Sequence, residues 1–296
     1  MSIFASRVAS GETPVVQNSK ECFEIYGFPH SPFVQAVLMA LHAGDRPHRL
    51  TLLPWWNTFR RFGVLMPILR DADGVHLRES EQILERLGHS SLTDEERTHL
   101  GTAWRGVLHR PDSIRKFLTA FSRTGDPDPV RVRGLLKDFL RAFVGLYFLV
   151  LIRSAVRRIG YSDPDDFYEG FHYWEERLAS QRFLAGDDPD SADFMLLGVI
   201  ECHASVPVPP MRTIVEDPRL GNLRGWIERM HSALPAYPYF YSAMHLESGA
   251  RKPEAASLVS RAAFFSGALV MVAAFPLTLA VIIYFMRARQ KFLTQY

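Results

Sequence analysis

The sequence predicts a mixed α/β domain, then an all-helical domain, then one C-terminal membrane helix. The first prediction rests on short, alternating strand and helix patterns between residues 22 and 88. The second rests on helical patterns throughout residues 92–245, and the third on 25 consecutive uncharged residues at 262–286. A chain of 296 residues is long enough for two domains, each with its own core.

The overall composition excludes several classes of protein. The formal net charge of +2 gives no reason to expect a nucleic-acid partner. The two cysteines, Cys22 and Cys202, are too few for a disulfide-rich framework or a cysteine-based zinc cluster, and no metal site is expected. The sequence contains no Walker loop, GxSxG, HExxH or CxxC motif, so the corresponding hydrolase and dithiol chemistries lack their residues.

Residues 1–21 precede the first domain. They contain no apolar run long enough for a secretory signal, so a disordered leader is expected. The serines, Arg7 and the scarcity of acids are also features of a transit peptide, which stays as the alternative.

The first domain, residues 22–88, opens with a strand, a helix and a second strand. The first strand is Phe23–Tyr26, and a loop leads from it to Ser31-Pro32, where proline at the first position starts a helix. That helix has apolar residues at helical spacing and ends at Gly44. The second strand is His48–Leu53.

The rest of the first domain is expected to be a hairpin followed by a helix. The strands Ile68–Arg70 and Val75–Leu77 flank an Asp-Gly turn, in which glycine supplies the positive φ. Met66-Pro67 opens the hairpin, and proline tolerates a cis peptide bond far better than other residues do. Ser80 stands at the N-cap position of the last helix, which Gly88 closes.

A proline-led hairpin followed by Glu-Ser at a helix start resembles the second half of a thioredoxin-like domain. More narrowly, it resembles the amino-terminal domain of the glutathione S-transferase family. The stretch YGFPHSPF, residues 26–33, is similar to the first strand–helix junction of that family.

The resemblance implies that glutathione binds at Met66, Pro67, Glu79 and Ser80. The backbone of Met66, before the cis-proline, would pair with the cysteinyl part of glutathione, and Glu79 and Ser80 would hold the γ-glutamyl group. The residue types agree with this assignment, because a helix N-terminus with a serine hydroxyl favours an anion and a carboxylate receives an ammonium.

The resemblance also implies a catalytic Tyr, Ser or Cys near the first strand–helix junction. Ser31 is the candidate, because the dipole of a helix N-terminus stabilises a thiolate. Tyr26, on the strand, is the second choice. A serine supports conjugation of glutathione to an electrophile but forms no mixed disulfide, so glutathione-dependent reduction is disfavoured. Plain helix capping by Ser31 is the alternative.

The connection at residues 54–66 departs from the family, because it is shorter and unusually aromatic. Arg60 and Arg61 are candidates for the glycine carboxylate of glutathione, or are solvated arginines. Trp55 and Trp56 line a hydrophobic substrate pocket in one interpretation, and pack against the second domain in the other.

The second domain, residues 92–245, is expected to be all-helical. Its longest element is Val130–Ile159, which contains no proline. Arg141 and Arg153 bracket an apolar run well below the roughly 20 residues of a membrane span, so a buried helix in a bundle is expected.

The stretch FLAGDDPDSADF, residues 183–194, resembles the second-domain signature of the same family, where a capping box starts a buried helix. Asp190 takes the cap position, where the family has Ser or Thr, and Asp193 follows three residues later. Both side chains accept hydrogen bonds from first-turn N–H groups, so their expected role is structural. With the closing helix at 217–237, the resemblance runs from about residue 23 to residue 241.

The uncharged stretch 262–286 is long enough to cross a hydrocarbon core of roughly 30 Å at about 1.5 Å per residue. Pro276 is tolerated in a membrane helix. We therefore expect a single-pass, tail-anchored protein, with residues 246–261 as the linker and residues 287–296 as a basic tail. By charge, the basic tail favours the cytoplasmic side, which would place the folded domains on the opposite side of the membrane. The lack of a signal sequence and the glutathione-type fold instead favour folded domains that face the cytosol.

Two functions agree with these features. The first is a membrane-anchored glutathione transferase that conjugates glutathione to hydrophobic electrophiles in detoxification, with a homodimer as the assembly that the resemblance allows. The second is a catalytically inactive interaction module tethered to a membrane, as in the metaxins and the ganglioside-induced differentiation-associated group, which are similar in layout.

Overall fold

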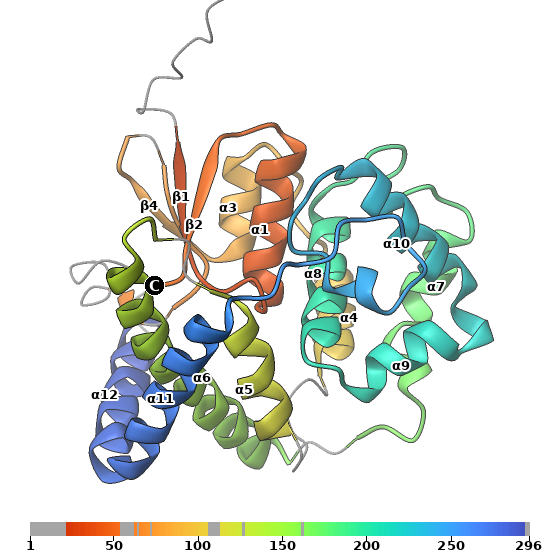
Figure 1. Cartoon of the computed structure of the whole chain (residues 1–296). Coiled ribbons are helices and arrows are strands. Elements are labelled where there is room, and N and C mark those ends of the chain that lie inside the picture. Colours follow the sequence, from red (N-terminus) through yellow and green to blue (C-terminus); the bar gives the residue numbers. More distant parts are fainter. Residues whose placement is uncertain are drawn as a thin grey trace, which may run out of the picture.

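The computed structural model describes residues 22–53, 62–63, 65–71, 73–105, 113–125, 128–160 and 163–293. Figure 1 shows a small sheet with its helices, a helical domain beside it, and a separate group of helices at the lower left. The expected leader lies outside the described residues, as do the four candidates singled out in the connection: Trp55, Trp56, Arg60 and Arg61.

The first domain contains a four-stranded sheet with the order β2-β1-β3-β4. Strand β1 is parallel to β2 and antiparallel to β3, and β3 is antiparallel to β4. The elements of this domain are β1 (Phe23–Tyr26), α1 (Pro32–Ala43), β2 (His48–Thr51), β3 (Ile68–Arg70), β4 (His76–Arg78) and α3 (Ser80–Arg86). This order and topology confirm the expected thioredoxin-like arrangement.

Strand β4 and the N-cap of α3 are each shifted by one residue from the prediction. Strand β4 begins at His76 because the Asp71 carboxylate accepts the N–H of Val75 at 2.8 Å and keeps that residue in the turn. The N-cap of α3 is Glu79, and Ser80 is the first helical residue, since the Glu79 carbonyl already accepts the N–H of Ile83 at 3.1 Å.

Helices make up the elements that follow the sheet domain. They are α4 (Asp94–Trp104), α5 (Ser113–Arg123), α6 (Arg131–Ile159), η1 (Phe167–Gly170), α7 (His172–Leu178), α8 (Ser191–Ser205), α9 (Pro209–Glu216), η2 (Pro218–Leu220), α10 (Gly221–Ala233), η3 (Tyr241–Met244), α11 (Leu258–Ala273) and α12 (Phe275–Leu293). The η elements are 3₁₀ helices.

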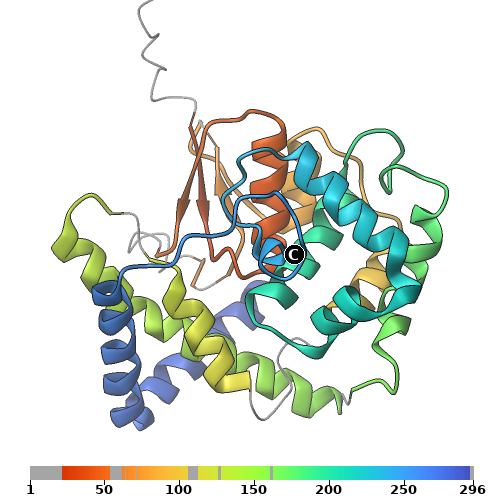
Figure 2. The same cartoon turned by 45° about the vertical axis from the view of Figure 1, so that its right-hand side comes forward.

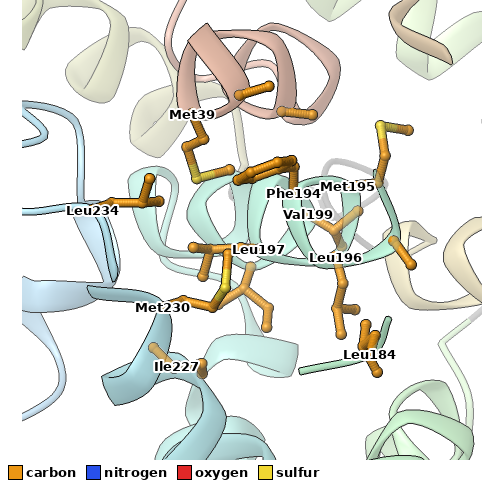
Figure 3. Packing of buried hydrophobic residues seen from close by; sticks show 14 of the residues in the cluster. Met39, Leu184, Phe194, Met195, Leu196, Leu197, Val199, Ile227, Met230 and Leu234 are labelled. Atoms are coloured by element: carbon orange, nitrogen blue, oxygen red, sulfur yellow. The ribbon is translucent and has the colours of Figure 1, made fainter. Parts of the chain in front are cut away.

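Helix α8 is the centre of the core, because every one of its residues is buried. It lies between α1 and α10, and Figure 3 shows Met39 of α1 and Phe194 of α8 side by side in this layer. A helix that is apolar all round is stable only when neighbours cover all its faces. Gly198 allows α8 to approach α1 closely, since a Cβ at this position would overlap the carbonyl oxygen of Pro32 at the start of α1.

The expected capping box is present at the start of α8. Asp190 is the N-cap, and the Asp193 carboxylate accepts its N–H at 3.2 Å. Asp193 also accepts the N–H of Leu184 at 2.9 Å and the indole N–H of Trp226 at 2.8 Å. Burial raises the pKa of the Asp193 carboxyl, and these three donors offset that rise in part.

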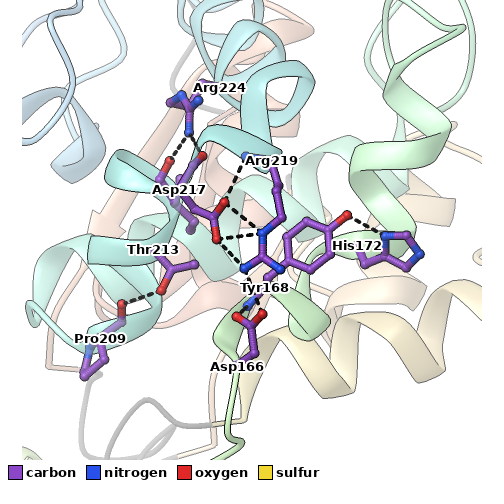
Figure 4. Close-up of polar contacts among 9 residues, drawn as sticks. Asp166, Tyr168, His172, Pro209, Thr213, Asp217, Arg219 and Arg224 are labelled. Carbon is purple, nitrogen blue, oxygen red and sulfur yellow. Dashed lines mark hydrogen bonds and ion pairs between the residues drawn. The ribbon is translucent and has the colours of Figure 1, made fainter.

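A second polar group joins η1 to the α9–η2 segment (Figure 4). The Arg219 guanidinium binds the carboxylates of Asp217 at 2.6 Å and Asp166 at 2.8 Å, and lies 4.0 Å from the centre of the Tyr168 ring. Because the Arg219 and Asp166 side chains are 49% and 41% exposed, this ion pair orients the two segments more than it stabilises them.

Helix α6 packs among α5, α11 and α12, as expected for a helix in a bundle. Arg141 is fully buried, with its guanidinium 2.8 Å from the Asp138 carboxylate, which also accepts the hydroxyl proton of Ser260. By length and composition alone, Arg131–Arg158 is the one unbroken described helix that could also cross a membrane. Two bent helix pairs would raise that number to three if each pair counted as one span.

The prediction of one straight helix over residues 262–286 is corrected. The stretch forms two helices, α11 and α12, bent by 97°. Pro276 has no N–H to donate to α11, so the helical hydrogen bonding stops at Ala274. The Thr278 hydroxyl donates to the Met271 carbonyl at 2.8 Å and satisfies one of the freed acceptors. Helix α11 also starts at Leu258, inside the stretch expected to be linker.

Replacing Asp193 should destabilise the protein far more than replacing Asp190. Asp193→Ala leaves the buried N–H donors of Leu184 and Trp226 and the partly buried N–H of Asp190 unpaired, which we expect to lower the free energy of unfolding by about 3–5 kcal/mol. Asp190→Ala removes a partly exposed cap and should lower it by about 0.5–2 kcal/mol. Urea unfolding followed by tryptophan fluorescence measures both, and equal losses would contradict the assignment.

The close approach of α8 to α1 gives a second test. Gly198→Ala should lower the free energy of unfolding by about 1–3 kcal/mol, because the added methyl group forces Pro32 away. Gly101→Ala is the matched control, since Gly101 is also in a helix but faces open space, and it should raise stability by about 0.5–1 kcal/mol. Similar effects of the two substitutions would show that the α1–α8 contact is not tight.

Candidate functional site

The register of the sheet brings three site segments to one edge. Ile68 of β3 lies opposite Arg78 of β4, so Pro67 and Glu79 are the next pair at the open end of the hairpin. Ile68 also lies opposite Tyr26 of β1, so the loop toward Ser31 leaves the sheet at the same edge. The expected binding segments and the expected catalytic segment therefore meet at one end of the domain.

The hairpin end has the backbone features expected of the family. The Met66-Pro67 peptide bond is cis, Pro67 is buried and Met66 is half-buried. Glu79 has a φ of 65°, a value that a non-glycine residue adopts at a cost of about 1–3 kcal/mol and that clusters at functional sites. Its side chain is exposed, and no described residue forms an ion pair or hydrogen bond with its carboxylate, whereas Ser80 is buried.

A cavity of about 160 Å³ lies next to this edge, between the first domain and the helices. Ser31 and Met66 both line it. The rest of the wall is almost entirely apolar and includes Phe28, Phe33, Trp104, Phe117, Phe121, Phe148, Leu151, Ile152 and Val206. An apolar cavity of roughly this size holds a benzene-sized molecule.

Ser31 is the N-cap of α1, but its hydroxyl makes no capping hydrogen bond. Among the described residues, its hydrogen bonds engage the backbone alone, since its N–H donates to the Phe28 carbonyl and its carbonyl accepts the N–H of Gln35, both at 3.0 Å. The loop before it is held by the Gln35 amide, which donates to the Pro29 carbonyl at 2.6 Å and accepts the Tyr237 hydroxyl proton at 2.6 Å. The structure therefore holds the Ser31 backbone in place and leaves the hydroxyl uncommitted.

Tyr26, the second catalytic candidate, is not among the residues that line the cavity. Its ring is buried against Phe62 and Ile68, and its hydroxyl donates to the Glu24 carboxylate at 2.7 Å. Glu24 in turn accepts from Arg49 at 2.6 Å. Of the two candidates, Ser31 is the one that lines this cavity.

Sequence reasoning missed His30, which also lines the cavity. Its Nε2 lies 2.7 Å from the Thr124 hydroxyl, and its ring stacks on Phe121 at 4.7 Å. Burial, together with the positive charge of Arg141, lowers the pKa of His30 to about 3, so the ring is neutral at physiological pH. Its Nδ1 is buried without a hydrogen-bond partner in the described part of the chain. The position directly before Ser31 was the only signal for it in the sequence.

Cys202 is the second residue of the wall that the sequence did not single out. Burial raises the pKa of its thiol to about 12, so the side chain stays protonated at physiological pH. A protonated, buried thiol behaves as a small apolar group rather than as a nucleophile. Among the described residues, no group of His, Cys, Asp and Glu is suited to hold a metal ion.

The sheet order, the cis-proline hairpin and the helical domain that follows together define the architecture. The fold is glutathione S-transferase-like. It agrees with the resemblance seen in the sequence, although no protein-family model and no curated protein matches the chain.

Solved structures with some likeness include glutathione transferases. A delta-class enzyme from Nilaparvata lugens is 17% identical, with 84% of this chain and 99% of that chain covered and a TM-score of 0.41. An unclassified enzyme from Bombyx mori is 16% identical, with 83% and 96% covered and a TM-score of 0.42. Glutaredoxin 2 from Salmonella typhimurium, in complex with glutathione, is 15% identical, with 76% and 99% covered and a TM-score of 0.40. Likeness at this level says nothing about activity.

The buried histidines give a pH prediction. The folded-state pKa values of His30 and His203 are lowered from 6.5 to about 3 and about 4 by burial, so only the unfolded chain takes up protons as the pH falls below 6.5. Stability is therefore lost from pH 6.5 downward, by up to about 1.4 kcal/mol per pH unit for each histidine. His30→Gln should remove one histidine's share of that slope, as measured by urea unfolding between pH 7 and pH 4. An unchanged slope would contradict a buried, neutral His30.

Proposed function

We propose that the protein binds glutathione and conjugates it to small apolar electrophiles. The observation that supports this most is the shared cavity, in which the uncommitted Ser31 hydroxyl and the residue before the cis-proline, Met66, line one apolar space. A glutathione thiol and an apolar second substrate could meet there with water largely excluded.

In this proposal the hairpin end holds the tripeptide. The backbone of Met66 pairs with the cysteinyl residue, and the unpaired Glu79 carboxylate receives the γ-glutamyl ammonium. Ser80, buried at the start of α3, donates to the γ-glutamyl carboxylate. The resemblance to glutathione S-transferases implies these assignments, and the register that sets Met66-Pro67 opposite Glu79-Ser80 supports them.

The chemical role of Ser31 is to stabilise the glutathione thiolate. Its hydroxyl donates to the sulfur, which lowers the thiol pKa and releases the proton to solvent. The thiolate then attacks the electrophilic carbon, a carbon–sulfur bond forms, and the leaving group departs with its electron pair. The aromatic and aliphatic wall of the cavity selects an apolar partner for this step.

We further propose that the protein acts at a membrane, with its folded domains facing the cytosol. Residues 262–286 carry no charge, and several large apolar side chains of α11 and α12 are more than half exposed, among them Leu269, Val272 and Leu277. Soluble proteins rarely expose so many apolar side chains in one place. Apolar electrophiles concentrate in a bilayer, so a membrane location would supply the substrate.

The rival function is a tethered module without catalysis. One observation favours it: neither Glu79 nor Ser80 lines the cavity, so glutathione would have to reach from the hairpin end to Ser31. Calorimetric titration of the full-length protein in detergent with glutathione separates the two functions. The transferase must bind glutathione, whereas the tethered module need not.

Ser31→Ala should lower the rate of conjugation roughly ten- to hundredfold, the worth of one hydrogen bond to a charged sulfur. Glutathione affinity should stay nearly unchanged, because the hydroxyl interacts chiefly with the ionised thiol. Initial rates with an apolar electrophile and calorimetry measure the two effects. Ser180→Ala, at an exposed serine of the helical domain, is the matched control.

Ser31→Cys is the companion variant, because a low-pKa cysteine there should gain thiol exchange with glutathione. If the Ser31→Ala variant conjugates glutathione at the parent rate, Ser31 has only a structural role at the start of α1. A parent that binds no glutathione and turns over no apolar electrophile would end the enzyme proposal.

A further inference from the structure

Helices α11 and α12 form a V whose bend is apolar and whose ends are basic. The exposed side chains nearest the bend are Leu269, Val270, Val272, Phe275 and Leu277, each between 49% and 71% exposed. Figures 1 and 2 show the bend projecting away from both domains. Soluble proteins do not leave a projecting tip of this composition in water without a covering partner.

Both arms of the V are attached to the folded body. Helix α11 lies on α6, where a Cβ at Gly267 would overlap the Phe139 carbonyl and where Phe264 is fully buried. Helix α12 returns to the same helix, since the Phe285 ring lies 6.1 Å from the Phe143 ring in an edge-on contact and Ile282 is buried.

The middle of α12 also reaches the first domain. A Cβ at Gly63, two residues before the cavity residue Leu65, would lie 3.4 Å from the Phe285 ring. The chain thus leaves the body along α11 and comes back to it along α12, as Figure 2 shows. A straight membrane span would have to break these contacts.

The bend is suited to an apolar medium because its backbone is hydrogen-bonded locally. The Ala274 N–H donates to Val270, the Thr278 N–H donates to Ala274, and the Thr278 hydroxyl donates to Met271. Membrane helices tolerate proline where serine or threonine side chains satisfy the freed carbonyls in this way. The uncharged part of neither arm is long enough to cross alone, since 12 residues of α11 (262–273) and 12 residues of α12 (275–286) each extend about 18 Å against a hydrocarbon core of roughly 30 Å.

The charges select a lipid surface over other partners. No acidic residue follows Glu254, whereas Arg261 begins the uncharged stretch and Arg287, Arg289 and Lys291 end it. The two ends of the V are therefore basic and the bend between them is uncharged, which matches anionic headgroups above a hydrocarbon layer.

We propose that α11 and α12 form a wedge that dips into one leaflet of an anionic bilayer by its bend and leaves on the same side. The C-terminal basic tail and the folded domains then lie on one face of the membrane, in place of a crossing tail anchor. This rests on the membrane location given under the proposed function, and it does not depend on whether the protein is an enzyme.

Three measurements on the full-length protein test the wedge. The protein, with Cys22→Ser and a C-terminal epitope, is bound to preformed vesicles of phosphatidylcholine with or without phosphatidylserine. An added cysteine, Val272→Cys or Val75→Cys, carries an environment-sensitive fluorophore, and protein without an added cysteine controls for the buried Cys202. Val272 and Val75 are the same residue type with 54% and 53% exposure, but Val75 lies in the β3–β4 turn.

We expect the fluorophore at 272 to shift to the blue and to be quenched by a lipid-borne quencher, and the fluorophore at 75 to do neither. The epitope should be cleaved by protease added outside intact vesicles. Val272→Asp should lower the vesicle partition coefficient roughly tenfold or more, Val75→Asp should not, and phosphatidylserine should raise it.

Other outcomes overturn the wedge in separate ways. An epitope that stays protected while the folded domains are digested means a crossing span. A fluorophore at 272 that is already blue-shifted without lipid, in a protein that is dimeric and does not float with vesicles, means that a second copy covers the bend. A monomer that does not float removes the membrane location itself, while conjugation measured in solution decides the catalytic proposal independently.

Discussion

The contact between α1 and α8 is the constraint on which the candidate site depends. Helix α8 is buried on every face and is fixed at its start by Asp193, so it offers a rigid surface. At Gly198 that surface touches the backbone of Pro32, the first residue of α1. Ser31 directly precedes Pro32, so the position of its hydroxyl at the cavity follows from the close approach of two helices from different domains.

Helix α6 links the cavity to the C-terminal helices. Phe148, Leu151 and Ile152 of its second half line the cavity, whereas Asp138 of its first half accepts the Ser260 hydroxyl of α11. The buried Asp138–Arg141 pair within α6 gives little net stability, because desolvation offsets most of its attraction. Both residues also contact α11, since Asp138 accepts the Ser260 hydroxyl and the Arg141 guanidinium lies 4.9 Å from the centre of the Phe264 ring, and these contacts orient α6 against α11. One helix thus orients both the apolar wall of the site and the helix that carries the exposed bend.

The parts predicted from the sequence are those with local signals. The Asp-Gly turn, the proline before β3 and the cap at Asp190 each act within a few residues, and the structure has all three. The sequence predicts Ser80 as the cap of α3, because serine is the better capping type. In the structure the cap is the preceding residue, Glu79, which has a strained, positive φ. No local pattern reveals such strain, since the surrounding structure enforces it.

The sequence by itself determined that residues 262–286 are apolar, uncharged and interrupted by proline, because composition is a property of the chain. Whether they cross a membrane, cover a core or bend back is decided by what they contact, and only the tertiary structure brings Gly267 against Phe139 and Phe285 against Phe143. The same holds for the site. Ser31 is a candidate because the resemblance implies a catalytic residue at the first strand–helix junction. The burial of His30 and the turning of Tyr26 toward Glu24, in contrast, depend on distant side chains such as Thr124, Phe121 and Arg49. Burial is a sum over neighbours in space, and a linear pattern records only neighbours in sequence.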